Sequence, residues 1–190
     1  MTIYSVRNDV KTYRYVLPTD AETTRQEPLL FDCERLLEGW KPPEVFVCEP
    51  KLKRGNFMGV GMGGPFACDE QTRYHDEMAQ LLEMSGELLP LPLENNTWYI
   101  MNVLECINAL DREHSEWHPS MQTMKIGGPK KCVFHANRVP ETPLFKIPET
   151  SRGEILCAEN AYDPAYEFKR MYEHLGLTGL RFEKLWSDEE

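Results

Sequence analysis

Apolar side chains recur at the period of an α-helix most clearly over residues 69–84. The apolar side of this helical wheel comprises Tyr74, Met78, Leu81 and Leu82. Acidic side chains recur at every seventh position on the opposite side, at Asp69, Asp76 and Glu83. The pattern therefore predicts an amphipathic helix with a buried apolar stripe and an acidic outer face.

A second helix is predicted near residues 164–175, between two strand-like runs that begin at Ile155 and end near Trp186. Asp163 is a good N-cap, Pro164 suits the first helical turn, and Gly176 suits a left-handed stop. The apolar stripe of this helix comprises Phe168, Met171, Tyr172 and Leu175. We expect that stripe to be buried.

Strand patterns fill much of the remaining chain. Residues 97–104 form a continuous apolar and aromatic run that predicts an interior strand, with a turn at Asn95 and Asn96 before it. Leucines alternate with Pro90 and Pro92 over residues 89–93, and these prolines restrict that strand to an edge. Further strands are expected at residues 3–6 and 13–17 as an opening hairpin, and at 29–31, 45–47, 132–134 and 144–147. Residues 51–65 read as a loop and 106–117 as a short helix or turn.

Strands and helices do not alternate regularly, which predicts an α+β fold with a mostly antiparallel sheet. A chain of 190 residues with 41% hydrophobic side chains is long enough for one core, so we expect a single domain over residues 1–190. Residues 1–65 would supply N-terminal strands and a glycine-rich loop. No run approaches membrane-spanning length and the start lacks a secretory pattern, which predicts a cytoplasmic protein with six free cysteines.

Three segments carry a resemblance to a known family: residues 88–117, 144–148 and 154–186, the last with a helix that runs into Gly-Leu-Thr-Gly-Leu-Arg-Phe. Residues 88–186 thus resemble family eleven of the bacterial immunity domains, which are found beside polymorphic toxins. The resemblance implies that residues 66–190 are the immunity-like portion. It also implies a cytoplasmic antidote that binds a cognate toxin, without catalysis, cofactor or metal.

The net charge of −10 is concentrated in one region of the chain. Residues 69–116 contain eleven acids and two bases, a balance of −9, so the rest of the chain is nearly neutral. A field of this sign repels nucleic acid and anionic lipid and attracts basic protein surfaces. The alternative interpretation is a solvated face that keeps the protein soluble.

The residues expected to bind a toxin follow from this charge. Asp69, Asp76 and Glu83 would meet lysine or arginine side chains around the toxin's active site. Glu116 and Trp117 lie together near a loop, and Trp117 is the expected aromatic anchor.

Two alternatives from other classes remain open. His114 and His118 are four residues apart, and Cys132 with His135 forms a second pair at ligand-like spacing, so a small enzyme or zinc protein would use these four side chains. A regulatory protein could instead self-associate through the strand edge near residues 89–93. The glycines of residues 59–64 lack the following Lys-Ser or Lys-Thr of a phosphate-binding loop, and the sequence leaves the oligomeric state open.

Overall fold

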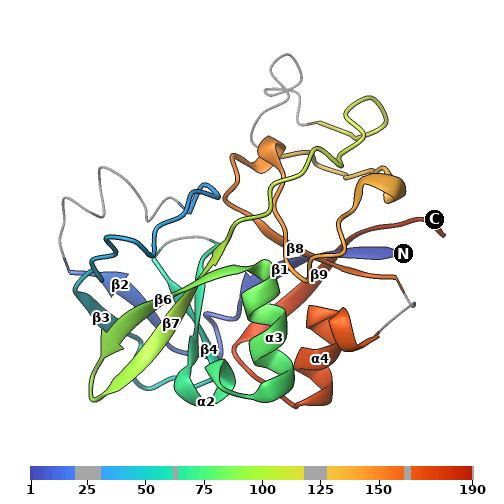
Figure 1. Ribbon diagram of the computed structural model, residues 1–190. Coiled ribbons are helices and arrows are strands. Elements are labelled where there is room, and N and C mark those ends of the chain that lie inside the picture. Colours follow the sequence, from blue (N-terminus) through green and yellow to red (C-terminus); the bar gives the residue numbers. More distant parts are fainter. Residues whose placement is uncertain (20–30, 62–63, 118–127, 161–163, 190) are drawn as a thin grey trace.

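A computed structural model describes residues 1–19, 31–61, 64–117, 128–160 and 164–189 (Figure 1). The smaller sheet has the strand order β8–β1–β9. The larger sheet has the order β3–β2–β4–β5–β7–β6. The pairing of β2 with β4 is parallel and the other pairings between these strands are antiparallel, which confirms the α+β class with a mostly antiparallel arrangement.

The smaller sheet consists of β1 (Thr2–Asn8), β8 (Ile155–Glu159) and β9 (Leu180–Ser187). The larger sheet consists of β2 (Tyr15–Pro18), β3 (Val45–Cys48), β4 (Phe57–Val60), β5 (Phe66–Asp69), β6 (Gly86–Leu93) and β7 (Asn96–Val103). The α-helices are α2 (Glu70–Arg73), α3 (Asp76–Ser85) and α4 (Phe168–His174). Short 3₁₀ turns are η2 (Ala136–Arg138), η3 (Pro148–Thr150) and η4 (Pro164–Tyr166). Within the described ranges, no helix is long and apolar enough to cross a membrane.

The helical region expected over residues 69–84 forms as two helices. The backbone of Tyr74 ends α2, and His75 adopts an extended conformation with φ −74° and ψ 119° before α3 begins. Met78, Leu81 and Leu82 are buried as expected. Tyr74 is 61% exposed, because the break at His75 turns its side chain away from that stripe.

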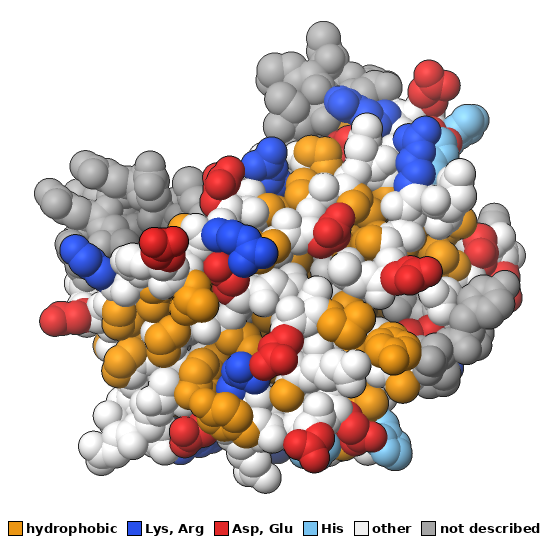
Figure 2. Space-filling model, in the orientation of Figure 1, with side chains coloured by type: hydrophobic (Ala, Val, Ile, Leu, Met, Phe, Trp, Pro, Cys, Tyr) orange, Lys and Arg blue, Asp and Glu red, His pale blue; other side chains and the backbone are white. Residues whose placement is uncertain are grey.

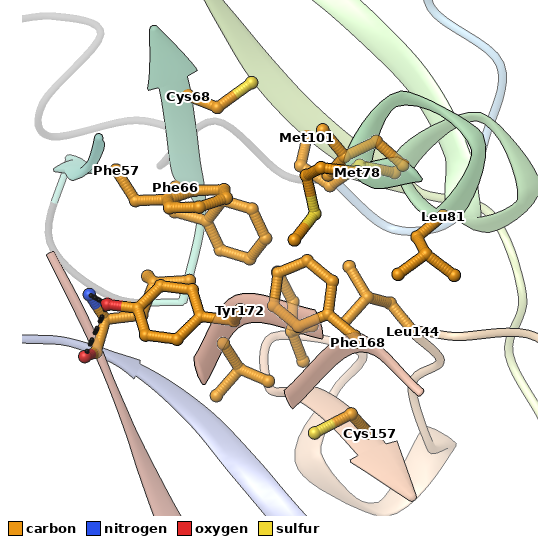
Figure 3. Packing of buried hydrophobic residues seen from close by; sticks show 14 of the residues in the cluster. Phe57, Phe66, Cys68, Met78, Leu81, Met101, Leu144, Cys157, Phe168 and Tyr172 are labelled. Carbon is orange, nitrogen blue, oxygen red and sulfur yellow. Dashed lines mark hydrogen bonds between the residues drawn. The ribbon is translucent and has the colours of Figure 1, made fainter. Parts of the chain in front are cut away.

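An aromatic core joins the two sheets beneath α3 and α4 (Figure 3). Phe168 lies on α4, with its ring centroid 6.0 Å from that of Phe57 on β4 and 6.2 Å from that of Phe66 on β5. All three are at most 1% exposed. Burial of each such side chain contributes about 1.5–3 kcal/mol to the stability of the folded state. The α4 stripe expected from sequence is therefore the contact that holds the C-terminal segment against the larger sheet.

The end of α4 confirms the stop expected at Gly176. Gly176 has φ +62°, and its N–H donates to the carbonyl of Glu173 at 3.1 Å. The N–H of Leu177 donates to the carbonyl of Tyr172 at 3.0 Å, which completes a Schellman motif. At the other end, Glu167 precedes α4 without a side-chain cap, and Asp163 lies outside the described residues.

The opening hairpin expected from sequence is wrong. β1 pairs with β8 and β9 from the C-terminal part of the chain, whereas β2 pairs with β3 and β4 in the other sheet. The seven residues of β1 find longer partners in β8 and β9 than the four residues of β2 could offer. The loop expected over residues 51–65 is wrong in part, because β4 lies inside it.

Three other expectations change in the structure. Residues 132–134 and 144–147 make only isolated bridges, such as Leu110 with Phe134 and Phe145 with Leu156. Residues 106–117 contain bridges and a turn without a helix. Phe31 is buried outside any strand, while Leu29 and Leu30 lie outside the described residues. The segments 106–117, 132–134 and 144–147 share one hydrophobic cluster, whereas Phe31 belongs to the cluster beside β6 and β7.

The edge position of β6 and the interior position of β7 are confirmed. Leu93 pairs with Asn96 across a turn at Glu94 and Asn95, one residue earlier than expected. Residues 31–40 pack against the face of β6 and β7 that carries Leu89 and Ile100.

Hydrogen bonds to β6 and β7 hold residues 31–40 in place, and we call this segment the 31–40 strap. Glu87 accepts the N–H of Leu36 at 2.7 Å, and Asn102 donates to the carbonyl of Glu34 at 2.8 Å. Trp40 Nε1 donates to the carbonyl of Pro90 at 2.8 Å. Because Pro90 and Pro92 lack N–H donors and the Pro90 carbonyl is already bonded, this edge is a poor template for strand pairing with a second copy.

The six cysteines are free thiols, as expected. Cys68, Cys132 and Cys157 are buried, and the other three are partly buried. Burial raises the pKa of the Cys68 thiol to about 12, so this side chain stays protonated and packs as a small hydrophobic group.

Candidate protein-binding surface

An aromatic and arginine cluster lies on the surface where α2, α3 and β7 meet. The ring centroids of Tyr74 and Tyr99 are 6.0 Å apart in an edge-to-face arrangement, and their hydroxyl oxygens are 3.2 Å apart. The Arg73 guanidinium lies 5.3 Å from the Tyr74 ring centroid and 6.0 Å from that of Tyr99. Arg73 also pairs with Glu83 on α3 at 2.9 Å. We call these four residues the Tyr74 cluster.

Strand alternation and the break between α2 and α3 orient the two tyrosines of the Tyr74 cluster. Tyr99 alternates along β7 with Trp98 and Ile100, which face the 31–40 strap, so the Tyr99 ring points to the helical side of the sheet. Because the helix breaks at His75, the Tyr74 side chain lies beside the Tyr99 ring. The hydrogen bond with Tyr74 and partial burial raise the pKa of Tyr99 to about 12, so the Tyr99 hydroxyl remains protonated and able to donate.

Acidic side chains surround this cluster. Glu70 at the start of α2 and Asp76 and Glu77 at the start of α3 are exposed. Figure 2 shows hydrophobic side chains gathered over β6 and β7 toward α2, with basic and acidic side chains among them. The surface therefore combines aromatic rings, one paired arginine and unburied carboxylates within a small area.

The three acids predicted on the first helix have different roles in the structure. Asp69 is the N-cap of α2 and accepts the N–H of Thr72 at 2.8 Å. Asp76 is exposed at the start of α3, and Glu83 is exposed and paired with Arg73. Asp76 and Glu83 can meet a partner, whereas Asp69 first stabilises the local backbone.

Glu116 and Trp117 lie in a different part of the molecule. The segment that carries them is at the opposite end from α2 in Figure 1. Trp117 is partly buried against a hydrophobic cluster, and its Nε1 donates to the carbonyl of Arg112 at 3.2 Å. The backbone of Glu116 bridges to Lys131. The predicted site residues thus divide into two groups that do not form one contiguous site.

The four residues of the alternative zinc site are only partly brought together. His114 Nδ1 lies 2.8 Å and His135 Nδ1 3.9 Å from Asp111 Oδ2, and hydrogen bonding from His114 lowers the pKa of Asp111 to about 2. Burial raises the pKa of the Cys132 thiol to about 12, so this thiol is protonated in the absence of a metal. His118 lies outside the described residues, and among those described no group of three or more His, Cys, Asp and Glu side chains is arranged to hold a metal ion.

The sequence pattern did not identify Tyr74 and Tyr99 as surface residues. Tyr74 fits the buried helical stripe by spacing, and Tyr99 sits in a continuous apolar run. A possible signal was the pair Arg73-Tyr74 directly before His75 and Asp76, where polar residues interrupt the helical pattern.

Comparisons of the chain with protein-family models, with curated proteins and with solved structures find no match. The fold and the surface define this chain as an α+β protein with a preformed aromatic and acidic surface.

Proposed function

We propose that this protein neutralises a cognate bacterial toxin by stoichiometric binding, with the Tyr74 cluster and the acids around it as the contact surface. The observation that carries the proposal is the 61% exposure of Tyr74, a large aromatic side chain whose position is nevertheless held by Tyr99 and Arg73. Tyrosine and arginine are among the residues that most often dominate binding energy at protein interfaces.

Preorganisation supports this assignment. Arg73 is held between Glu83 and the two tyrosine rings, so its side chain has already lost much of its rotamer freedom before a partner arrives. Binding by such a surface costs less conformational entropy than binding by mobile side chains. The rings supply apolar contact area, and the hydroxyls and guanidinium supply hydrogen bonds.

Charge supports a basic partner. Glu70, Asp76 and Glu77 surround the cluster, and the chain carries a net charge of −10. Complementary charge accelerates association and rejects partners of the wrong sign. A toxin that acts on nucleic acid or another anionic substrate has a basic active-site surface of the required kind. Together with the resemblance of residues 88–186 to immunity family eleven, this favours a cytoplasmic antidote that acts without chemistry of its own.

The test is binding to the toxin domain encoded by the neighbouring gene, measured by calorimetry with purified proteins. We expect one-to-one binding and protection of cells that express the toxin. Tyr74→Ala should weaken binding by at least about 30-fold, which corresponds to about 2 kcal/mol for an interface hot spot. Phe46→Ala is the matched control, because Phe46 is 47% exposed on β3, remote from α2 along the sheet order, and should change affinity less than about twofold.

Charge is tested separately with Asp76→Lys combined with Glu77→Lys. We expect a lower association rate and a weaker dependence of that rate on salt. Glu183→Lys is the control, because Glu183 is exposed on β9 in the other sheet. Normal affinity in both the Tyr74 and the charge variants would overturn this surface as the interface, and absence of binding by the unmodified protein would overturn the immunity function.

A further inference from the structure

A pocket of about 410 Å³ opens beyond the C-terminal end of α3. Its walls come from α3, the segment after η2, the end of β8 and η4, and the residues that carry the argument are Met84, Pro140, Glu141, Thr142, Tyr166 and Glu167. This volume is within the range of about 300–1,000 Å³ that is typical of ligand pockets. No residue of the Tyr74 cluster lines the pocket, although Glu83 of the cluster directly precedes Met84 on α3.

The apolar part of the pocket is open to a partner. Met84 is 41% exposed and Tyr166 is 45% exposed, although both are large side chains that usually avoid water. Pro140 adds a rigid apolar surface beside them. Methylene groups of an incoming side chain would be covered by these three residues, and the face of the Tyr166 ring attracts a cation.

The polar part of the pocket is acidic. Glu141 is exposed at the rim. Glu167 is 4% exposed, accepts the N–H of Asn160 at 2.7 Å, and lies 2.6 Å from Arg170 Nε, so its charge is already balanced. Thr142 Oγ1 is buried and has no hydrogen-bond partner within the described part of the chain. Glu141 and the Tyr166 ring are therefore a charged group and an aromatic face that a ligand can reach in this pocket.

We infer that this pocket receives an arginine side chain that protrudes from the partner protein. The three methylenes of arginine match the apolar wall formed by Met84 and Pro140. The planar guanidinium can stack on Tyr166 while it donates two hydrogen bonds to Glu141. A carboxylate ligand would meet Glu141 with the wrong sign, and a purely apolar ligand would cover the Glu141 carboxylate without a hydrogen bond.

The spacing of the two sites fits a single partner. This inference rests on the proposed function, because it assigns the pocket as a second anchor for the protein that covers the Tyr74 cluster. Both sites use α3, which has ten residues and is about 15 Å long, and Glu83 of the cluster directly precedes Met84 at the pocket. A standard interface covers about 800 Å² on each partner, which spans both sites. Hydrophobic side chains gather over both regions on the same face in Figure 2.

The pocket can be tested without the toxin. The probe is N-acetyl-arginine methylamide, added to protein with ¹³C-labelled methionine methyl groups, and the Met84 signal is assigned through Met84→Leu. We expect saturable shifts of the Met84 methyl signal at millimolar probe. The norleucine analogue, which has the apolar stem alone, should bind about tenfold more weakly, because it lacks the charge-assisted hydrogen bonds. No shift at Met84, or equal affinity for both probes, would overturn the arginine pocket.

Matched variants test whether Glu141 binds the guanidinium of the arginine probe. Glu141→Gln should weaken the arginine probe several-fold and leave the norleucine probe unchanged. Glu113→Gln is the control, because Glu113 is exposed and does not line the pocket. Equal affinity of the arginine probe for the unmodified protein and the Glu141 variant would contradict the assigned contact.

The affinity for the toxin domain then tests whether this pocket contacts the partner protein. Tyr166→Ala should weaken toxin binding about tenfold or more, with circular dichroism as the check that the variant folds. Unchanged toxin affinity would overturn the second anchor. A toxin that fails to bind the unmodified protein contradicts the proposed function, whereas a failed arginine probe contradicts only the pocket, so the two failures are distinguishable.

Discussion

The Tyr172 hydroxyl donates to the carbonyl oxygen of Leu180 at 3.1 Å and accepts the N–H of the same residue at 3.0 Å (Figure 3). Tyr172 belongs to α4 and Leu180 is the first residue of β9. One buried phenol therefore satisfies both backbone groups at the start of a strand and sets the position of that strand relative to the helix before it.

Replacement of this phenol should destabilise the fold. Tyr172→Phe keeps the ring and leaves the Leu180 N–H and carbonyl without their partner, which costs about 1–3 kcal/mol in the free energy of unfolding. Urea denaturation measures the loss. Tyr74→Phe is the control, because the Tyr74 hydroxyl is on an exposed residue, and its stability should change by less than about 0.5 kcal/mol. A Tyr172 variant as stable as this control would contradict the assigned role.

The same hydroxyl should make stability depend on alkaline pH. Burial raises the pKa of Tyr172 from 10.0 to about 12. Because the folded pKa is the higher one, the stabilising contribution is complete below pH 10 and is lost as pH rises toward 12. We expect the difference in free energy of unfolding between the unmodified protein and Tyr172→Phe to shrink between pH 9 and pH 11.5. A constant difference across this interval would contradict the shifted pKa.

Alanine substitutions at two glycines near β9 should lower the stability of the fold by different amounts. Both have positive φ, +62° at Gly176 and +109° at Gly179. A Cβ at Gly179 would lie 1.9 Å from the carbonyl oxygen of Phe57, whereas at Gly176 no atom lies within 4 Å. We expect Gly176→Ala to cost about 1 kcal/mol from backbone conformation alone. Gly179→Ala should cost clearly more, because the backbone of β4 must move; equal midpoints in urea would contradict the close contact.

The 31–40 strap should loosen when Glu87 is removed. Glu87 is 8% exposed and accepts N–H groups from Leu36 and from the Asn102 side chain, so Glu87→Ala leaves both donors unsatisfied. We expect a loss of about 1–3 kcal/mol and faster amide hydrogen exchange in peptides that cover residues 31–40. Glu38→Ala is the control on the same segment, because Glu38 is exposed. Unchanged exchange in the Glu87 variant would show that the strap is held by its apolar contacts alone.

Short-range signals predicted the parts of the fold that depend on neighbouring residues. Pro90 and Pro92 predicted the edge strand because their missing donors exclude an interior position, and the structure places β6 at the edge. Gly176 predicted the end of α4 because its φ of +62° suits glycine best. The spacing of Phe168 and Met171 predicted the buried stripe.

The partners of β1 and the Tyr74 cluster could not be predicted in this way. Tyr74 has helical spacing to Met78, yet it is exposed because the backbone breaks at His75 and because Tyr99, on a strand 25 residues later, receives its ring. The exposure of Asp76 and Glu83 was predicted from the sequence, whereas the contact between Tyr74 and Tyr99 was not.

The sequence by itself determined the α+β class, the helix stop, the edge strand and the acidic region, because each depends on backbone preference, periodicity or charge within a short segment. Only the tertiary structure decided that β1 pairs with β8 and β9, that Tyr74 meets Tyr99, and that α3 contributes to both the Tyr74 cluster and the pocket. The reason is that these contacts join segments distant in sequence. Their free energy comes from shared burial and ladder hydrogen bonds, which no local pattern records.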